Sequence, residues 1–271
     1  MINLLSANLF HLRKSLLFWV TLGLCAAAGA WQPIQTFLEF ERYIPLDNVF
    51  FTYAMLNGLL LAVFLPLFFG TEYSDGTIRN KLAAGHARPS VYLANLITAI
   101  LTAFLFCGVY ILFTLAVGIP LLGAPKYSKL LFTTTLLSLL AAAAWCALYT
   151  LINMNLSRKA GAAVSCILLY LALFLGAMIT FSKLDAPEFY PAYTLTVDGE
   201  MDTVMERTPH YLQPEERWLY EFLLDLNPMG QSVQYIDLTP DRPVRLVLCS
   251  LGIIAVTTAA GTALFRRKDL K

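Results

Sequence analysis

Six stretches of this chain contain no Asp, Glu, Lys or Arg, and each is at least 20 residues long. A helix rises about 1.5 Å per residue and the hydrocarbon layer is roughly 30 Å thick, so each stretch is long enough to cross a bilayer. They cover residues 15–38, 49–70, 91–122, 130–157, 160–182 and 246–265. Charged residues make up only 14% of the chain, too few to cover six core helices in water. We therefore expect an all-α membrane protein with six transmembrane helices.

The six spans place most of the basic residues on one side of the membrane and most of the acidic residues on the other. With the N-terminus inside, the inner segments hold 11 basic and three acidic residues, whereas the outer segments hold 8 basic and 15 acidic residues. Lys and Arg in short loops favour the cytoplasmic side of a membrane. Both termini are therefore expected in the cytoplasm.

The residues before the first span form an amphipathic pattern. Leu and Ile recur at three- and four-residue spacing, with polar residues between them, at Ile2, Leu5, Leu9, Leu12 and Leu16. This pattern predicts a helix with one apolar stripe. Such a helix either lies in the membrane interface or continues the first span inward, and the sequence favours neither alternative.

The longest polar segment lies between the fifth and sixth spans, at residues 183–245, with 12 acidic and 5 basic residues. Its stretch 214–225 starts with Pro and two Glu and predicts a helix, and Thr194 to Val197 predicts a short strand. Asp198 to Asp202 is acidic but lacks the closing Glu of an EF-hand, so we interpret it as a solvated turn. The segment is expected to form a small extracellular structure on the bundle.

Several chemistries have no signature in this sequence. It contains no G-x-x-x-x-G-K-[ST], no H-E-x-x-H and no G-x-S-x-G, the patterns typical of nucleotide hydrolysis, zinc peptidases and serine hydrolases. Ion-coupled carriers usually keep acidic, basic or His residues inside the bilayer, and the six apolar stretches contain none. We therefore predict a protein that is not an enzyme and holds no metal or cofactor. If it moves a substrate uphill, the energy must come from another subunit.

The loop between the second and third spans, residues 71–90, has the most distinctive sequence. Ser74 and Asp75 are helix-capping residue types, Thr77 to Ala84 is compatible with a helix, and Gly85 is suited to ending it. The short helix would present Arg79, Asn80 and Lys81 on its polar side, with Ile78 and Leu82 as an apolar edge four residues apart. A basic ridge of this kind suits a groove in a soluble partner, although a basic loop at lipid headgroups has the same composition.

The run E-Y-S-D-G-T-I-R-N-K-L-A-A-G-H-A-R-P-S, at residues 72–90, resembles the signature loop of the type-two ABC exporter permeases. The leading amphipathic helix, the six spans, the larger segment before the last span and the short basic tail are similar to that family as well. The resemblance implies a membrane subunit of an ATP-driven exporter in a bacterial plasma membrane. This loop would then be the coupling helix that contacts a separate ATPase.

The resemblance also implies which residues take part. The ATPase-coupling interface would comprise Glu72, Gly76, Thr77, Ile78, Arg79, Lys81, Gly85 and Arg88. The second and fifth spans flank the translocation pathway in this family, which makes Asn57, Pro66, Tyr170 and Phe174 candidates for it, with helix packing as the alternative. The expected partners are ABC ATPase subunits carrying ATP and Mg, a second permease subunit and membrane lipid, and no nucleic acid.

The sequence also allows two functions other than that of an exporter subunit. A non-transporting sensor or immunity protein would bind a cationic peptide through the acidic segment 183–245 and use its helices as an anchor. A membrane enzyme is disfavoured because the spans lack ionisable side chains. The identity of the transported substrate does not follow from the sequence.

Overall fold

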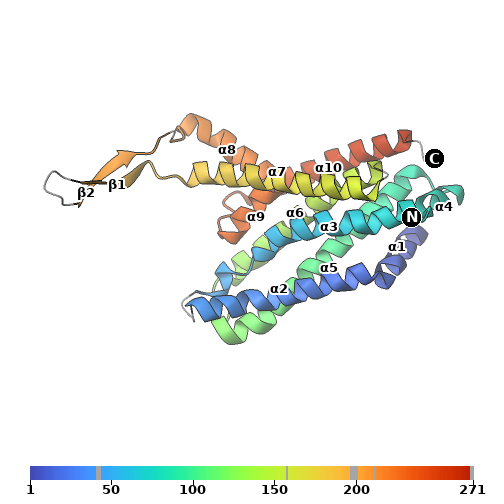
Figure 1. Cartoon of the computed structure of the whole chain (residues 1–271), viewed down its shortest axis with the longest axis horizontal. Helices are drawn as coiled ribbons and strands as arrows, with labels where there is room; N and C mark the ends of the chain where they lie inside the picture. Colours follow the sequence, from blue (N-terminus) through green and yellow to red (C-terminus); the bar gives the residue numbers. More distant parts are fainter. Residues whose placement is uncertain (41–43, 157, 196–200, 210, 269–271) are drawn as a thin grey trace.

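The protein is a bundle of six long apolar helices, which confirms the fold class expected from the sequence (Figure 1). The computed structural model describes residues 1–40, 44–156, 158–195, 201–209 and 211–268, with side chains described outside 192–204. The six long helices are α2 (Leu16–Phe40), α3 (Thr52–Ser74), α5 (Arg88–Leu122), α6 (Ser128–Asn155), α7 (Lys159–Asp185) and α10 (Pro243–Arg267). Each is long and apolar enough to cross a bilayer, and the chain is a multi-pass helical membrane protein.

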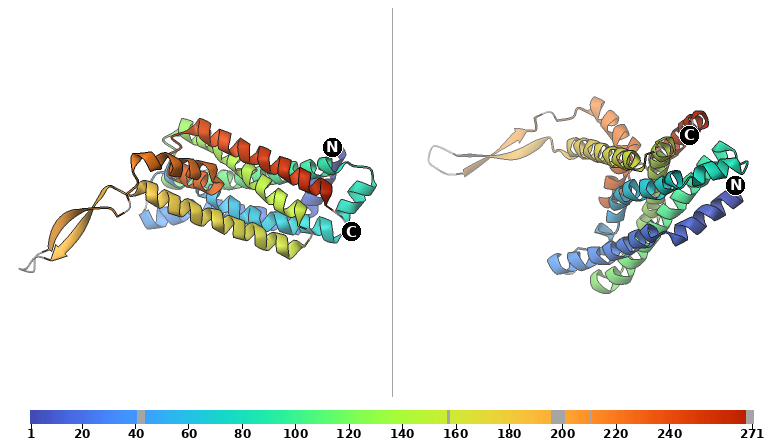
Figure 2. Two further views of the ribbon diagram at one scale, coloured as in Figure 1. Left: turned by 90° about the horizontal axis from the view of Figure 1, so that it is seen from above. Right: turned by 45° about the vertical axis from the view of Figure 1, so that its right-hand side comes forward.

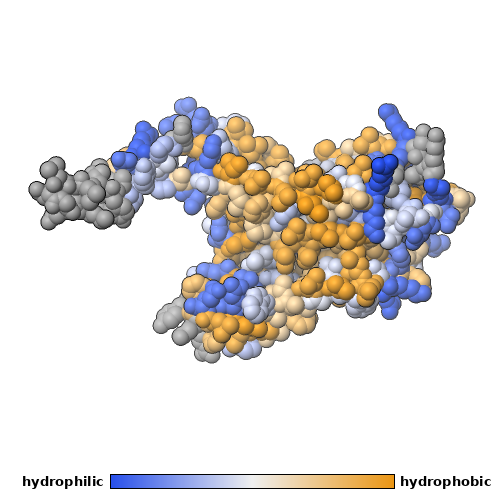
Figure 3. Space-filling model, in the orientation of Figure 1, coloured by the Kyte–Doolittle hydropathy of each residue, from blue (hydrophilic) through white to orange (hydrophobic). Residues whose placement is uncertain are grey.

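Three of these helices form the centre of the bundle. In the most apolar part of α3, α5 and α6, between 44% and 61% of the residues are buried, compared with 22% to 28% in α2, α7 and α10. The outer helices therefore carry apolar side chains on the surface, such as Leu168, Leu175 and Val256. These produce the apolar band across the middle of the bundle, with hydrophilic residues at both ends (Figure 3). A surface of this kind is compatible with lipid as its solvent.

Helices α2 and α5 approach each other closely. A Cβ atom at Gly29 would lie 2.5 Å from the backbone oxygen of Tyr110, so only glycine permits this approach. The Thr114 hydroxyl donates a hydrogen bond across the same contact to the Gly29 carbonyl oxygen, at 3.1 Å. Small residues and cross-helix hydrogen bonds are typical of helix pairs in membranes.

The N-terminal helix α1 (Ile2–Lys14) is a separate element, because the backbone is extended at Ser15 and α1 turns away from α2 (Figure 1). Its expected apolar stripe is only partly confirmed: Leu12 is buried and Leu5 and Leu9 are partly buried, but Ile2 is 84% and Leu16 78% exposed. The buried positions are Leu4, Asn8 and Leu12, which pack toward α5. The side of α1 that faces the bundle therefore includes a polar residue, Asn8, whose hydrogen-bond partners lie in other helices.

The short helix α4 (Thr77–Ala83) lies at the end of the bundle where α1 begins and α10 ends (Figures 1 and 2). The expected capping by Ser74 and Asp75 is wrong: the N-cap is Gly76, in the left-handed region with φ of 68°, and Asp75 instead ends α3. The expected stop at Gly85 is confirmed. Gly85 donates to Leu82 and His86 to Lys81, the hydrogen-bond pattern of a Schellman motif.

The segment after α7 forms a β-hairpin and two helices at the opposite end. Strands β1 (Phe189–Leu195) and β2 (Met201–Arg207) pair antiparallel and project from the bundle (Figures 1 and 2). β1 begins before the expected strand, and residues 196 and 197 lie outside the described residues. Of the expected turn, residues 198–200 lie outside them as well. The predicted helix 214–225 is confirmed as α8 (Pro214–Leu226).

The second helix of this segment, α9 (Pro228–Ile236), is not predicted from the sequence and lies inside the bundle. All residues from Pro228 to Tyr235 are buried, against α3, α6, α7 and α8. The Asn227 side chain caps the helix by accepting a hydrogen bond from the Met229 N–H at 2.9 Å. Within the segment 183–245, α9 is therefore packed into the bundle, whereas the β-hairpin projects from it (Figure 1).

Replacing Gly85 by Ala tests the Schellman ending of α4. The φ angle is 85°, and no neighbouring group lies within 4 Å of where the alanine Cβ would be, so the cost is confined to the backbone. We expect Gly85→Ala to destabilise the protein by about 1–2 kcal/mol. Thermal unfolding in detergent, followed by circular dichroism, would measure the change in Tm. Gly252→Ala, in α10 and equally free of close neighbours, serves as the control and should not lower Tm.

Candidate functional site

A buried ion pair holds α4 against the bundle. The Lys81 ammonium lies 2.8 Å from a carboxylate oxygen of Glu72, near the end of α3. The Lys81 side chain is 10% exposed and that of Glu72 is 1% exposed. Burying two charges is costly unless they are paired and their remaining hydrogen-bonding groups are satisfied. The position of α4 is therefore tied to α3 by a strong constraint.

Side chains from two further helices complete this pair. Asn95 of α5 donates to the second oxygen of Glu72 at 3.2 Å. Asn8 of α1 accepts from Lys81 at 2.8 Å and donates both to the Asn95 amide oxygen at 2.7 Å and to the Thr98 hydroxyl at 3.1 Å. We refer to these five residues as the α4 network: Asn8, Glu72, Lys81, Asn95 and Thr98. The network joins α1, α3, α4 and α5 through one set of hydrogen bonds.

The apolar side of α4 faces inward. Ile78 is 1% exposed and belongs to a cluster that draws residues from four further helices: Leu4, Val91, Tyr92, Ala94, Met154 and Phe265. Leu82 packs against the same cluster. The apolar edge that would suit a partner's groove is thus buried within the chain, and this burial helps to hold a helix of seven residues in place.

The end of α10 is fastened to the same region. One nitrogen of the Arg88 guanidinium donates to the carbonyl oxygens of Phe265 and Arg266, each at 3.1 Å, and to that of Lys268. Lys268 donates to the Tyr73 hydroxyl and to the Met154 carbonyl oxygen, both at 3.0 Å. Its ammonium also lies 4.3 Å from the centre of the Tyr73 ring. Desolvation by burial lowers the pKa of Lys268 from 10.5 to about 8.

The outward face of α4 is polar and small. Arg79, Asn80 and Ala83 are exposed there, and Gly85 is exposed at its end. Of the eight residues expected at a coupling interface, only Arg79 and Gly85 are exposed; Glu72 and Ile78 are buried, and the other four are partly buried. Their roles at an interface stay predictions, but the structure divides them into a surface pair and a supporting set beneath it.

The folded chain buries carboxylates at both ends of the bundle, although the six apolar stretches contain none. Besides Glu72, Asp47 is fully buried and accepts hydrogen bonds from the backbone N–H groups of Lys126 and Tyr127, at 2.9 and 3.1 Å. Asp225 is 2% exposed and pairs with Arg242 and Arg245. These buried carboxylates lie at the ends of the bundle, outside the six apolar stretches, in whose middle a charge would be hardest to stabilise.

Three of the four candidate pathway residues, Asn57, Pro66 and Tyr170, are buried, and Phe174 is partly buried. Tyr170 packs against Trp145, with ring centres 5.9 Å apart, and stacks on Phe174 at 6.3 Å. Pro66 is buried within α3. Asn57 is 5% exposed, and its carbonyl oxygen has no hydrogen-bond partner among the described residues. Helix packing accounts for Tyr170, Phe174 and Pro66, whereas Asn57 is a buried polar group with an unpaired oxygen.

A cavity of about 10 Å³ lies beside Asn57, lined by residues of α2, α3 and α5. This volume is close to the smallest that holds one water molecule. A water there would satisfy the free carbonyl oxygen. The sequence contains the signal for this site, an Asn within an apolar span, but not its partners.

Three residues at the α4 end of the bundle make contacts that the sequence does not predict. Asn8 and Asn95 look like ordinary polar residues on helices, and Lys268 looks like part of a basic tail. Asn8 and Asn95 are 87 residues apart in the sequence, and Lys268 and Tyr73 are 195 residues apart, so no local pattern indicates these contacts.

Comparison with protein-family models and with curated proteins found no match for this sequence.

Removing the positive charge of the α4 network should destabilise the protein strongly. Lys81→Met leaves the buried Glu72 carboxylate without a counter-charge, and we expect a loss of about 3 kcal/mol. The double variant Glu72→Gln, Lys81→Met has no unpaired charge and should recover at least about half of that loss. Thermal unfolding in detergent checks both. Lys129→Met, which removes an exposed lysine at the opposite end, is the control and should leave Tm nearly unchanged. Equal Tm values for Lys81→Met and Lys129→Met would contradict the prediction.

Lys268 predicts a pH dependence of stability. Its pKa is lower in the folded chain than the ordinary value, so between about pH 8 and pH 10.5 the unfolded chain binds more protons than the folded one. Stability contributed by this residue therefore rises with pH across that window. We expect Tm of the unaltered protein to rise relative to that of Lys268→Met when both are measured across this window. A constant difference over the same pH range would contradict the assignment.

Proposed function

We propose that this chain is the membrane-spanning subunit of an ATP-driven exporter, and that α4 is its contact with a separate ATPase. The observation that carries the proposal is the position of α4. It is a short helix at the end of the bundle, with a buried ion pair beneath it and a polar exposed face. The resemblance of residues 72–90 to the coupling loop of type-two ABC exporter permeases supports the same assignment.

The structure offers a physical path for force applied to α4. Any displacement of α4 acts directly on α1, α3 and α5 through the α4 network, because these hydrogen bonds are buried and costly to break. The cluster around Ile78 adds α6 and α10. In the proposed mechanism, ATP-driven movement of the ATPase shifts α4, and these helices follow as a rigid group. Two copies of the chain, or this chain and a second permease subunit, would enclose the pathway between them.

The energy source must lie outside the chain in this proposal. The sequence contains no phosphate-binding loop, and the buried carboxylates at the bundle ends are already paired or hydrogen-bonded. A carboxylate whose oxygens already accept from a cation or from N–H donors is a poor proton carrier, because protonation would break those interactions. ATP and Mg would accordingly be bound by the partner subunit.

The proposal places the α4 end on the cytoplasmic side of a bacterial plasma membrane, which supplies a control for its test. The five cysteines are all buried, so an introduced Asn80→Cys provides an exposed thiol at the α4 end and Glu215→Cys one at the α8 end. In intact cells, a membrane-impermeant maleimide should label Glu215→Cys and spare Asn80→Cys. The reverse pattern would overturn the proposed location of the ATPase contact.

The central test is co-purification with an ATPase. An affinity-tagged chain should retain an ATPase with a phosphate-binding loop, and Arg79→Glu or Asn80→Trp should lower the retained amount about tenfold or more, since each alters the exposed face of α4. Arg158→Glu reverses an exposed charge in another loop at the same end and should change retention less than about twofold. Thermal unfolding identifies any variant that fails to fold. A folded chain that retains no ATPase, or equal losses in Arg79→Glu and Arg158→Glu, would contradict the proposal.

A further inference from the structure

A groove lies on the surface where α6 and α10 pack against each other, near the start of both helices. Because α10 ends beside α4, this is the opposite end of the bundle (Figure 1). The apolar part of the groove has a volume of about 550 Å³. Leu136 of α6 and Val244 and Leu248 of α10 line it, and each of them is more than half exposed. Such aliphatic side chains match the apolarity of lipid acyl chains.

The groove continues into a second, polar part, which lies closer to the end of the bundle and has a volume of about 520 Å³. Thr133 and Pro243 line both parts, so the two form one continuous groove. The polar part is lined by the loop before α6 and by the first turn of α6, including Lys126 and Lys129. A phospholipid in one leaflet has the same order of groups, with its headgroup at the membrane surface and its acyl chains toward the middle.

The polar part of the groove is positively charged. Its lining includes the two lysines and no carboxylate among the described residues. Both lysines are exposed, and neither forms an ion pair within the part of the chain that the structure describes. The loop 123–129 contains no acidic residue, although the segments assigned to this side of the membrane hold 15 acidic and only 8 basic residues. This local excess of positive charge is complementary to an anionic headgroup.

A buried carboxylate fixes the backbone from which the first lysine extends. Asp47 is fully buried and accepts hydrogen bonds from the backbone N–H groups of Lys126 and Tyr127, at 2.9 and 3.1 Å. A carboxylate that accepts from two N–H donors holds them firmly, because such hydrogen bonds are stronger than those between neutral groups. The position of the loop beside the groove is therefore part of the fold.

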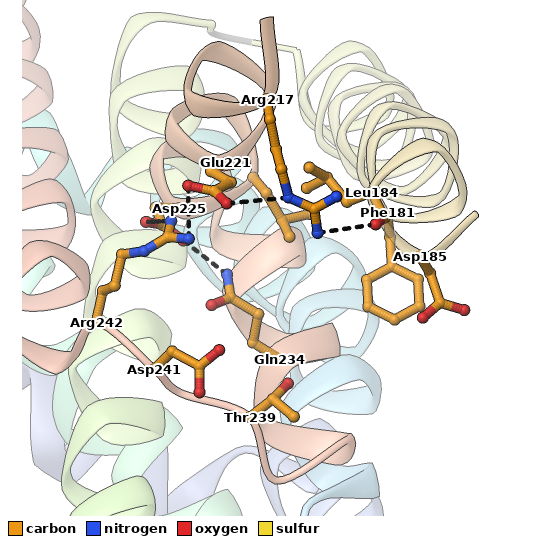
Figure 4. Close-up of a pocket in the computed structure, with 11 residues that line it drawn as sticks. Phe181, Leu184, Asp185, Arg217, Glu221, Asp225, Gln234, Thr239, Asp241 and Arg242 are labelled. Carbon is orange, nitrogen blue, oxygen red and sulfur yellow. Dashed lines mark hydrogen bonds and ion pairs between the residues drawn. The ribbon is translucent and has the colours of Figure 1, made fainter. Parts of the chain in front are cut away.

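The charged residues just before α10 do not line the groove. Arg242 lies against α8, where it contacts Glu221 at 2.5 Å and Asp225 at 3.7 Å (Figure 4). Asp241 lines the same recess between α7 and α8 (Figure 4). The two lysines thus set the sign of the charge in the groove, since the neighbouring arginine is neutralised by its own partners.

We infer that this groove binds an anionic phospholipid from the membrane leaflet at this end of the bundle. The headgroup phosphate accepts hydrogen bonds from Lys126 and Lys129, and an acyl chain lies along Leu136, Val244 and Leu248. The bound lipid bridges α6 and α10. The inference does not depend on the ATPase partner, because the groove lies at the other end of the bundle from α4.

Native mass spectrometry of the full chain in lipid-free detergent at low ionic strength tests the role of charge. The probes are palmitoyl-oleoyl phosphatidylglycerol, which is anionic, and phosphatidylcholine with the same chains, which carries no net charge. We expect the anionic lipid to bind about tenfold or more tightly, and Lys126→Gln with Lys129→Gln to remove this preference. Lys183→Gln with Arg207→Gln removes two exposed positive charges elsewhere at the same end and should leave the preference within about twofold.

A second pair of variants tests the apolar part of the groove. Thr133→Trp fills the junction of the two parts without changing the charge and should weaken binding of the anionic lipid about tenfold. Phe132→Trp is the matched control, because Phe132 is 68% exposed and does not line the groove, and it should change binding less than about twofold. Inorganic phosphate in large excess should not displace the lipid, since it lacks an acyl chain.

Four results would each overturn the inference. They are equal affinities for the two lipids, equal effects of the groove and control double variants, undiminished binding to Thr133→Trp, and displacement of the lipid by inorganic phosphate.

Discussion

The arrangement of the α4 end depends on one buried ion pair, Lys81 with Glu72. Two opposite charges in a low-dielectric interior stabilise a structure only when their other hydrogen-bonding groups are also satisfied. Asn8 and Asn95 meet that requirement, and they come from α1 and α5. The need to satisfy one pair therefore specifies the relative positions of four helices. It also sets the phase of α1, since Asn8 must face the bundle although apolar residues flank it.

The bilayer imposes a complementary division of the bundle. Charged groups are concentrated near the ends of the helices, where Glu72, Asp47 and Asp225 are each paired or hydrogen-bonded. Between these ends the helices associate through small residues and aromatic rings, as at Gly29 and around Trp145. Hydrogen bonds between helices join this packing, from the Thr114 hydroxyl to the Gly29 carbonyl oxygen and from the Tyr149 hydroxyl to the Gly58 carbonyl oxygen.

How much of this structure the sequence predicts depends on whether the determining contacts are local. The six spans follow from the absence of charge over 20 or more residues, and the end of α4 follows from Gly85, because both signals lie within one element. Helix α8 is predicted from its Pro and early Glu residues in the same way. Helix α9 has a comparable local signal, Asn227 followed by Pro, but its burial depends on contacts with distant helices.

The candidate site is only partly predictable, for a physical reason that also shapes the proposed mechanism. Sequence identifies α4 as amphipathic, but it does not tell whether the apolar edge faces a partner or the chain itself. The structure shows that Ile78 packs into the bundle, which leaves Arg79 and Asn80 as the exposed face. A partner that binds this face meets polar groups, so the contact would be sensitive to charge and salt. The apolar edge instead links α4 to the bundle. In the proposed exporter, recognition and transmission of force therefore use opposite sides of the same short helix.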